Sequence, residues 1–154
     1  MVEIVEAAGG EAIQTIRELF LEYQASLGVD LCFQGFQQEL DGLPGSYAPP
    51  GGRLLLALQH GSPCGCVALQ SIGDGSCEMK RLYVRPEARG AGVGIALVMQ
   101  VLEAAETIGY RRVCLDTLPS MQRAAKLYES LGFRDVPPYR HNPIAGSRYM
   151  ALDL

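Results

Sequence analysis

A short glycine-rich stretch, Arg89–Gly94, has the residue types of an anion-binding turn. It lies where a strand pattern gives way to a helix pattern, and three of its residues are glycines. Glycine has no Cβ atom, so a bound anion can approach the backbone closely. The N–H groups at the start of a helix point towards such an anion, and the helix dipole adds positive potential. With Arg85 and Arg89 reinforcing that field, the stretch predicts a site for a phosphate or pyrophosphate group.

Two common nucleotide-binding motifs do not fit the stretch. A dinucleotide fingerprint that began at Gly90 would place its third glycine on Ile95, and it should follow a strand directly. A Walker-type loop needs a Gly-Lys-Ser/Thr sequence, which is missing. A glycine-rich helix start that binds no ligand remains the alternative to a phosphate site.

Hydrophobic patterns predict the strands that position this turn. Leu54–Leu58 is apolar throughout, which favours burial on both faces of a sheet. The turn residues at His60–Pro63 and Gly73–Gly75 are short, so the strands that they join should form an antiparallel meander. The expected strands are Val2–Ala7, Leu54–Leu58, Cys64–Gln70, Cys77–Val84, Arg112–Thr117, Phe133–Val136 and Tyr149–Leu154.

Helical spacing of apolar residues predicts four helices between these strands. Gly28 is expected as a left-handed C-cap of the first helix, and Ser120 as the N-cap of the last. The apolar stripes run from Ala12 to Leu27, from Phe33 to Leu40, from about Gly92–Gly94 to Gly109, and from Met121 to Leu131. The predicted fold class is therefore α/β, of the α+β type, with a mixed sheet that carries helices on its faces.

Length and composition restrict the classes of protein that the chain can form. Its 154 residues, 48% of them hydrophobic, fit one domain over residues 1–154. The net charge of −4 disfavours nucleic acid as a partner. No apolar stretch approaches the ~20 residues that span a bilayer, so no membrane partner is expected. Glu3 and Glu6 do not suit a signal peptide, which predicts a cytoplasmic location. Homodimer formation stays open.

The cysteines predict a structural role and no metal site. With five cysteines and two histidines, the chain lacks the spacing of a zinc site. Cys64 and Cys66 are expected on one face of a strand, where free cysteine behaves as a small apolar residue. A metal or redox role is the alternative.

Two signatures in the sequence resemble those of the GNAT superfamily of acyl-CoA-dependent N-acyltransferases. Arg89, Gly92 and Gly94 match its Arg/Gln-x-x-Gly-x-Gly/Ala pattern. The segment Glu78–Val84 looks like the family's fourth strand, and Ala124–Phe133 is similar to its A-x-x-L-Y-x-x-x-G-F helix end. The resemblance extends over nearly the whole chain. It implies a mostly antiparallel central sheet that is splayed between strands 4 and 5, with helices on both faces.

The resemblance implies that acetyl-CoA lies in the wedge between those two strands. Its pantetheine would pair with backbone groups of Leu82 and Val84, as an added strand would. The family often carries an asparagine where this chain has Met121, so one polar contact to CoA is missing or supplied elsewhere. The implied cofactor contacts are Leu82, Tyr83, Val84, Arg89, Gly90, Ala91, Gly92, Val93, Gly94 and Ile95.

The resemblance also implies the chemistry. In the family the amine usually attacks the thioester directly, and a backbone N–H, here that of Leu82, polarises the thioester oxygen. Tyr128 matches the tyrosine that protonates the CoA sulfur, although it also fits a core stripe. Glu78 is the candidate general base. The alternatives are an exposed strand carboxylate, a carboxylate paired with Lys80 or Arg81, or a water chain that acts as the base instead.

The acceptor pocket is less well defined by the sequence. Relatives build it from the first two helices and the loop that follows, which here hold Phe33, Phe36 and Tyr47. Phe33 and Tyr47 are the expected substrate contacts, with core packing as the alternative. Asp116 and Thr117, at the end of a strand, either touch a substrate or cap the strand.

The function that the sequence predicts is an acetyl-CoA-dependent N-acetyltransferase acting on a primary amine. The negative net charge suits a cationic amine but does not separate a small amine from a peptide or protein amine. A non-catalytic acyl-CoA-binding or sensing module on the same fold is the alternative.

Overall fold

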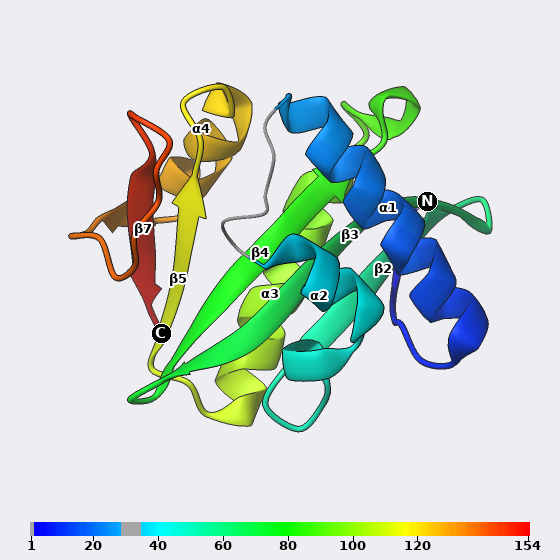
Figure 1. The fold of residues 1–154 in the computed structure, drawn as a ribbon, viewed down its shortest axis with the longest axis horizontal. Helices are drawn as coiled ribbons and strands as arrows, with labels where there is room; N and C mark the ends of the chain where they lie inside the picture. The colour runs from blue at the N-terminus through cyan, green and yellow to red at the C-terminus, as the bar shows by residue number, and fades with distance from the viewer. Residues whose placement is uncertain (1, 29–34) are drawn as a thin grey trace.

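One seven-stranded sheet, in the order β1-β2-β3-β4-β5-β7-β6, forms the centre of the computed structural model, which describes residues 2–28 and 35–154 (Figure 1). The strands are β1 (Val2–Glu6), β2 (Arg53–Gln59), β3 (Ser62–Gly73), β4 (Ser76–Val84), β5 (Arg112–Thr117), β6 (Arg134–Asp135) and β7 (Arg148–Asp153). The helices are α1 (Gly10–Leu27), α2 (Phe36–Asp41), α3 (Val93–Ile108) and α4 (Gln122–Ser130), with 3₁₀ turns η2 (Gly45–Tyr47) and η3 (Pro86–Ala88). The expected order of strands and helices is confirmed.

Strands β1 to β4 form the antiparallel meander that the turn residues predicted. The β2–β3 connection has positive φ at His60 and Gly61, and the β3–β4 connection has it at Asp74 and Gly75. A two-residue turn of type I′ requires positive φ at both of its central residues, and its twist matches that of the flanking strands.

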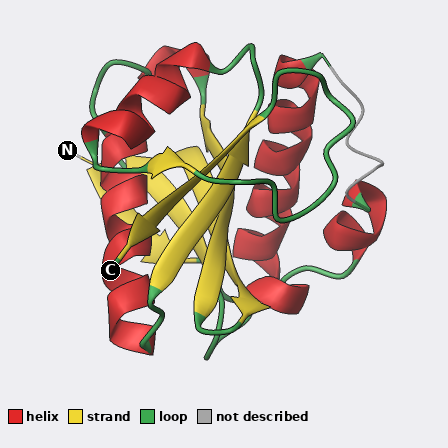
Figure 2. Cartoon of the chain, turned by 90° about the vertical axis from the view of Figure 1, so that its left-hand side faces the viewer, coloured by secondary structure: helices red, strands yellow, loops and turns green. Residues whose placement is uncertain are grey.

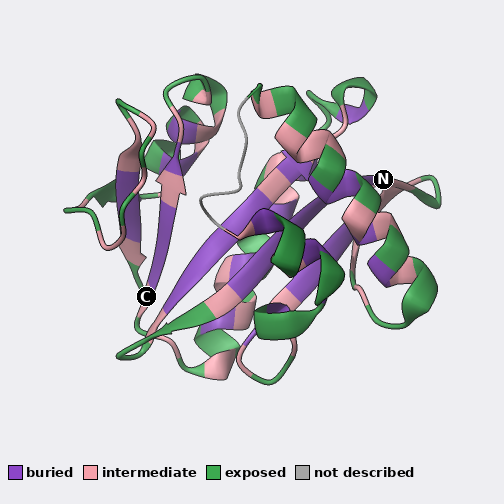
Figure 3. Ribbon diagram, viewed as in Figure 1, coloured by how far each residue is buried: buried purple, intermediate pink, exposed green. Residues whose placement is uncertain are grey.

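Helices cover both faces of the sheet (Figure 2). Helices α1 and α2 pack on one face in one apolar cluster, and α3 and α4 contribute to a second cluster on the other. Strand β2 alternates between them, because Leu54 and Leu56 belong to the first cluster whereas Leu55 and Ala57 belong to the second. The predicted burial of this strand on both faces is confirmed, and Figure 3 shows the continuous buried stretch of the central strands.

The expectation that Cys64 and Cys66 share one face of a strand was wrong. Cys64 lies in the cluster under α3, whereas Cys66 lies in the cluster under α1. Along β3, Gly65 faces Ala57 and Pro63 faces Leu58, so Cys64 is an extra residue with no partner of its own on β2. Such a bulge breaks the two-residue alternation of side chains, so it sends the two thiols to opposite faces.

The expected helix caps have mixed outcomes. Gly28 ends α1 with φ of 68°, as predicted for a left-handed C-cap. Ser120 does not cap α4, because Met121 occupies the N-cap position and no side chain bonds there. The Met121 N–H donates to the Leu118 carbonyl at 2.9 Å, and this turn carries the chain one residue further before the helix begins. Among the described residues, no helix combines the length and apolar character needed to cross a bilayer.

A second bulge, in β4, places two cationic residues on one face. Cys66 faces Tyr83 and Ala68 faces Lys80, so β4 contains one residue more than β3 between these pairs. Arg81 accommodates the extra residue with φ of 61°, in a region that few residues other than glycine adopt. Its guanidinium makes two hydrogen bonds to the Glu39 carboxylate, at 2.9 and 2.8 Å, and lies 5.2 Å from the centre of the Phe36 ring. Helix α2 therefore holds the bulge in place.

Strands β4 and β5 separate before the bulge is reached. They pair in parallel only from Ser76 to Glu78, opposite Arg112 to Cys114. From there β5 continues beside β7, while β4 follows β3 away from it (Figure 1). The predicted splay of the sheet between its fourth and fifth strands is confirmed, and it leaves one edge of β4 without a neighbouring strand.

The Arg81–Glu39 ion pair gives a test of this architecture. Removal of one partner from a buried ion pair leaves an uncompensated charge, which costs about 3–5 kcal/mol. The side chain of Arg81 is only 2% exposed. We expect Glu39→Ala to lower the free energy of unfolding by that amount in urea denaturation. Asp153→Ala, which breaks exposed ion pairs with Arg112 and Arg134, is the control and should cause a much smaller loss. Equal losses would contradict the role given to Glu39.

Candidate active site

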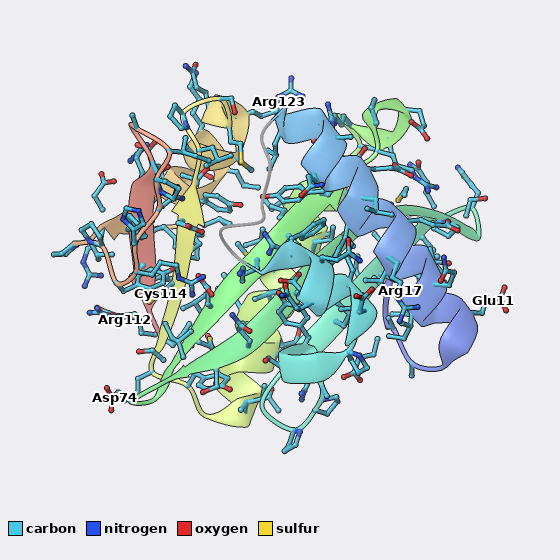
Figure 4. The ribbon with its side chains drawn as sticks, in the orientation of Figure 1. Glu11, Arg17, Asp74, Arg112, Cys114 and Arg123 are labelled. Atoms are coloured by element: carbon cyan, nitrogen blue, oxygen red, sulfur yellow. The ribbon has the colours of Figure 1, made fainter. Side chains whose placement is uncertain are left out.

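A cleft of about 540 Å³ lies at the open end of the wedge, bounded by the end of α1, the edge of β4 and the starts of α3 and α4. All the predicted cofactor contacts except Ala91 and Ile95 line it. Figure 4 labels Arg123 at the open, upper end of the wedge, with Asp74 and Arg112 towards the closed, lower end. The lining residues are Tyr23, Ser26, Leu27, Leu82, Tyr83, Val84, Ala88, Arg89, Gly90, Gly92, Val93, Gly94, Ser120, Met121, Arg123, Ala124 and Leu127.

The turn before α3 has the geometry expected of an anion site. Gly90 and Gly92 have φ of 86° and 80°, which glycine adopts at little cost. The first N–H groups of any helix have no carbonyl one turn earlier to donate to. In α3, the first such hydrogen bond within the described chain runs from the Ala96 N–H to the Gly92 carbonyl, at 3.1 Å. A Cβ atom on Gly94 would lie 3.9 Å from Val84 and 4.0 Å from Leu127, on the wall of the cleft. The missing side chain therefore leaves room for a ligand.

The two arginines near this turn have different surroundings. Arg89 lines the cleft, where its Nε donates to the Val84 carbonyl at 3.0 Å and its guanidinium lies 6.0 Å from the centre of the Tyr83 ring. Arg85 forms two hydrogen bonds to Glu22 on α1, at 3.0 and 2.8 Å. Since Glu22 balances the charge of Arg85, the cationic side chain facing the cleft from this turn is that of Arg89.

The edge of β4 presents backbone groups to the cleft. Arg85 donates its N–H to the Cys64 carbonyl on β3 at 2.8 Å, and the Tyr83 carbonyl also faces β3, beside Gly65. Backbone groups of alternate residues point to opposite sides of a strand. The N–H and C=O groups of Leu82 and Val84 therefore point towards the gap that β5 leaves.

A narrow cavity of about 30 Å³ adjoins the cleft and lies between β4 and β5. Leu82 and Tyr128 both line it, together with Asp116 from the end of β5. Tyr128 is 4% exposed and packs against Phe133, with ring centres 5.7 Å apart. Burial raises the pKa of Tyr128, and Tyr23 and Asp116 contribute in the same direction. The structure thus brings Tyr128 to the wedge beside Leu82, as a core residue whose hydroxyl stays protonated at neutral pH.

Glu78 lies where the two strands separate and is fully buried. Its carboxylate accepts hydrogen bonds from Gln70 at 3.0 Å, from the Tyr139 hydroxyl at 2.7 Å, and from Arg140. These three donors, one of them a guanidinium, occupy both oxygens of the carboxylate. The assignment of Glu78 as the general base stays a prediction, and this environment favours a positioning role instead.

Lys80, next to Glu78 on the same face of β4, lies between two cavities. It lines the narrow cavity and also a polar cavity of about 400 Å³ beneath α2. Burial lowers the pKa of the Lys80 ammonium to about 8, and the nearby charge of Arg81 adds to that effect. The lining of the polar cavity includes Glu39, Tyr47, Gln70, Lys80 and Arg140.

The aromatic residues expected to bind substrate do not form one cluster among the described residues. Phe33 lies outside the described residues. Phe36 is buried under Arg81, and Tyr47 packs edge-on against Phe20, with ring centres 6.4 Å apart. Tyr47 also lines the polar cavity, so its role as a substrate contact stays a prediction.

Sequence reasoning missed several residues around the wedge. Ser120 and Arg123 line the cleft beside Met121 and offer polar groups where the family's asparagine is absent. Arg123 lies two residues after Met121, so its closeness in sequence, but not helical periodicity, could have indicated it. Tyr139 and Arg140 reach Glu78 from a loop about 60 residues away, and no local pattern indicates that contact. Within the described residues, no cluster of His, Cys, Asp or Glu is arranged to hold a metal ion.

Comparison with known proteins agrees with the geometry. A model of the acetyltransferase (GNAT) family matches residues 13–133. An uncharacterized N-acetyltransferase of Schizosaccharomyces pombe is 43% identical over 144 residues, which cover 92% of this chain and 88% of that protein. The human N-acetylaspartate synthetase is 37% identical over 107 residues, which cover 69% of this chain and 34% of that protein. A GNAT-family acetyltransferase from Staphylococcus aureus Mu50 matches with a TM-score of 0.82 at 19% identity, over 99% of each chain. The chain belongs to the acetyltransferase (GNAT) family, and it is an acyltransferase.

Proposed function

We propose that this chain transfers an acetyl group from acetyl-CoA to a primary amine, and that the amine attacks the thioester directly. The observation that carries the proposal is the continuity of the site. The cleft at the α3 turn and the narrow cavity beside Tyr128 share Tyr23, Leu27, Leu82 and Met121 in their linings. A long ligand with phosphates at one end and a thioester at the other therefore has a single path along the edge of β4.

The residues of the cleft suit the chemical groups of acetyl-CoA. The glycine turn and Arg89 would hold the pyrophosphate, since backbone N–H groups at a helix start and a guanidinium both favour phosphate oxygens. The backbone groups of Leu82 and the N–H of Val84 would pair with the amides of pantetheine, whereas the Val84 carbonyl already accepts a hydrogen bond from Arg89. Ser120 and Arg123 would supply the polar contacts that Met121 cannot.

The narrow cavity would contain the reacting atoms. As the amine nitrogen bonds to the thioester carbon, the N–H of Leu82 stabilises the negative charge that develops on the oxygen. The carbon–sulfur bond then breaks, and the hydroxyl of Tyr128 gives its proton to the departing sulfur. Solvent takes the proton that the amine nitrogen loses and returns a proton to the Tyr128 phenolate. The carboxylate of Glu78 keeps its three donors.

Cofactor binding tests the proposal directly. A ligand at 100 times its Kd stabilises the folded state by about 2.7 kcal/mol, which corresponds to a Tm increase of about 5–11 °C for a domain of this size. We expect that shift with acetyl-CoA in differential scanning fluorimetry. The absence of any shift with CoA, acetyl-CoA and longer acyl-CoAs at saturating millimolar concentrations would contradict the proposal.

The room left by Gly94 gives a second test. Leucine at this position meets no strained φ, and its Cβ has only ordinary contacts, so Gly94→Leu should fold while its side chain fills the cleft. We expect its Kd for acetyl-CoA to rise at least ~10-fold, as measured by calorimetry. Gly10→Leu is the matched control, because its Cβ would lie in open space at the start of α1. Unchanged binding by Gly94→Leu would place the cofactor elsewhere.

Tyr128 gives the third test, which separates chemistry from packing. Tyr128→Phe keeps the ring and its buried area but deletes the hydroxyl. We expect kcat to fall ~10²-fold with an unchanged Kd for acetyl-CoA, when release of the CoA thiol is followed with a panel of amines. Aspartate belongs in that panel because one relative is named N-acetylaspartate synthetase. Tyr110→Phe, which deletes a hydroxyl bonded to Gly51 outside the wedge, is the control. If both variants keep the parent's kcat, Tyr128 is a core residue only.

A further inference from the structure

We propose that the acceptor amine carries a carboxylate, and that Lys80, together with Arg140, binds this carboxylate in the polar cavity beneath α2. The proposal rests on the proposed function and names the substrate class of the same site. It predicts that amino acids, rather than amines without an acid group, are the acceptors.

The position of Lys80 connects the polar cavity to the reacting atoms. Among the described residues, Lys80 is the only one in the linings of both the narrow cavity and the polar cavity. The narrow cavity in turn shares Leu82 with the cofactor cleft. An acceptor whose nitrogen reaches the thioester beside Leu82 and Tyr128 therefore extends past Lys80 into the polar cavity. Any acid group on that acceptor meets the ammonium on the way.

The charges around the polar cavity leave one cation without a partner. Arg81 forms two hydrogen bonds to Glu39, and Arg140 pairs with Glu78. Each of these arginines is therefore balanced by its own carboxylate. Among the described residues, Lys80 has neither an ion pair nor a hydrogen bond. Lys80 is nonetheless only 9% exposed. A buried charge without a partner is unfavourable, so an anionic group that enters the cavity would be strongly attracted to it.

The lowered pKa of Lys80 agrees with its burial without an anionic partner. Burial disfavours the charged ammonium and outweighs the opposing effect of Glu78 and Glu39. An acceptor carboxylate beside the ammonium would act in the opposite direction and keep it charged. Arg140 adds a second donor, since it lines the same cavity and uses Nη2 for its bond to Glu78.

The other end of the path suits an amine. Asp116 lines the narrow cavity with Tyr128, and its carboxylate accepts a hydrogen bond from Asn142 at 3.2 Å. The acceptor's route from the narrow cavity to the polar cavity thus has an acid group, Asp116, at one end and a cation, Lys80, at the other. A zwitterionic amino acid, with its ammonium towards Asp116 and its carboxylate towards Lys80, matches that polarity.

Matched pairs of amines test the substrate class. Each pair consists of an amino acid and its primary amide, for example glycine with glycinamide, leucine with leucinamide, and aspartate with its diamide. The two members have nearly the same size but differ in charge. We expect kcat/KM, measured by release of the CoA thiol, to be at least ~10-fold higher for the acids. The α-ammonium group of an amino acid amide loses its proton more easily than that of the free amino acid. Intrinsic reactivity therefore favours the amides, and a preference for the acids would have to come from the site.

Substitution of Lys80 tests the assignment of the residue. Lys80→Met keeps the length of the side chain but removes the charge, and we expect KM for the acids to rise at least ~10-fold. KM for the amides and for acetyl-CoA should not change. Lys80→Arg should retain the preference for acids. Lys126→Met is the matched control, because the chain's other lysine is exposed on α4. Since Lys80 has no partner, Lys80→Met should also raise the Tm of the free protein.

The outcomes separate this proposal from the function on which it rests. Equal use of acids and amides by the parent protein would overturn the carboxylate proposal alone. A fall in kcat for all amines in Lys80→Met, with KM unchanged, would also overturn it and assign Lys80 to proton transfer. If acetyl-CoA binds but no amine in the panel releases CoA, the proposed function itself is wrong.

Discussion

The interaction on which the site depends is the ion pair between Arg81 and Glu39. It holds β4 in a bulge at the level where β5 has already turned away, and Arg81 adopts positive φ there. The extra residue shifts the alternation of β4, so Lys80 and Arg81 face α2 while Leu82 faces the wedge. Without the bulge, the side chains beyond this point would exchange faces. The bulge thus decides which side chains of β4 face the polar cavity and which face the wedge.

The local charges around the wedge differ from the charge of the whole chain. The chain has a net charge of −4, yet the positive groups lie at the two ends of the path through the wedge. At one end the start of α3 and Arg89 face the cleft, and at the other Lys80 and Arg140 face the polar cavity. Near the turn, Glu22 balances the charge of Arg85, which does not line the cleft. The net charge of the chain therefore does not describe the groups that could bind a small anion.

The sequence was sufficient for features that depend on neighbouring residues. The hairpin turns, the glycine C-cap of α1 and the glycine turn before α3 each follow from local steric rules, and they appear where they were predicted. The separation of Cys64 and Cys66 and the bulge at Arg81 could not be predicted in this way, because register depends on a partner strand. Arg140, the ion-pair partner of Glu78, comes from a loop far along the chain, so this buried ion pair could not be predicted from the sequence either.

Tyr128 has two interpretations, as a core residue and as a proton donor, and its burial is compatible with both. A tyrosine whose pKa is raised by burial is a weaker acid than one in water, which at first disfavours proton donation. The thiolate that leaves in the same cavity is also removed from water, however, and burial raises the pKa of a thiol for the same reason. Both groups shift in the same direction, so the difference in pKa that drives the transfer is largely preserved. Packing against Phe133 holds the hydroxyl in one position. The core contacts of Tyr128 are therefore compatible with the role in proton transfer that we propose for it.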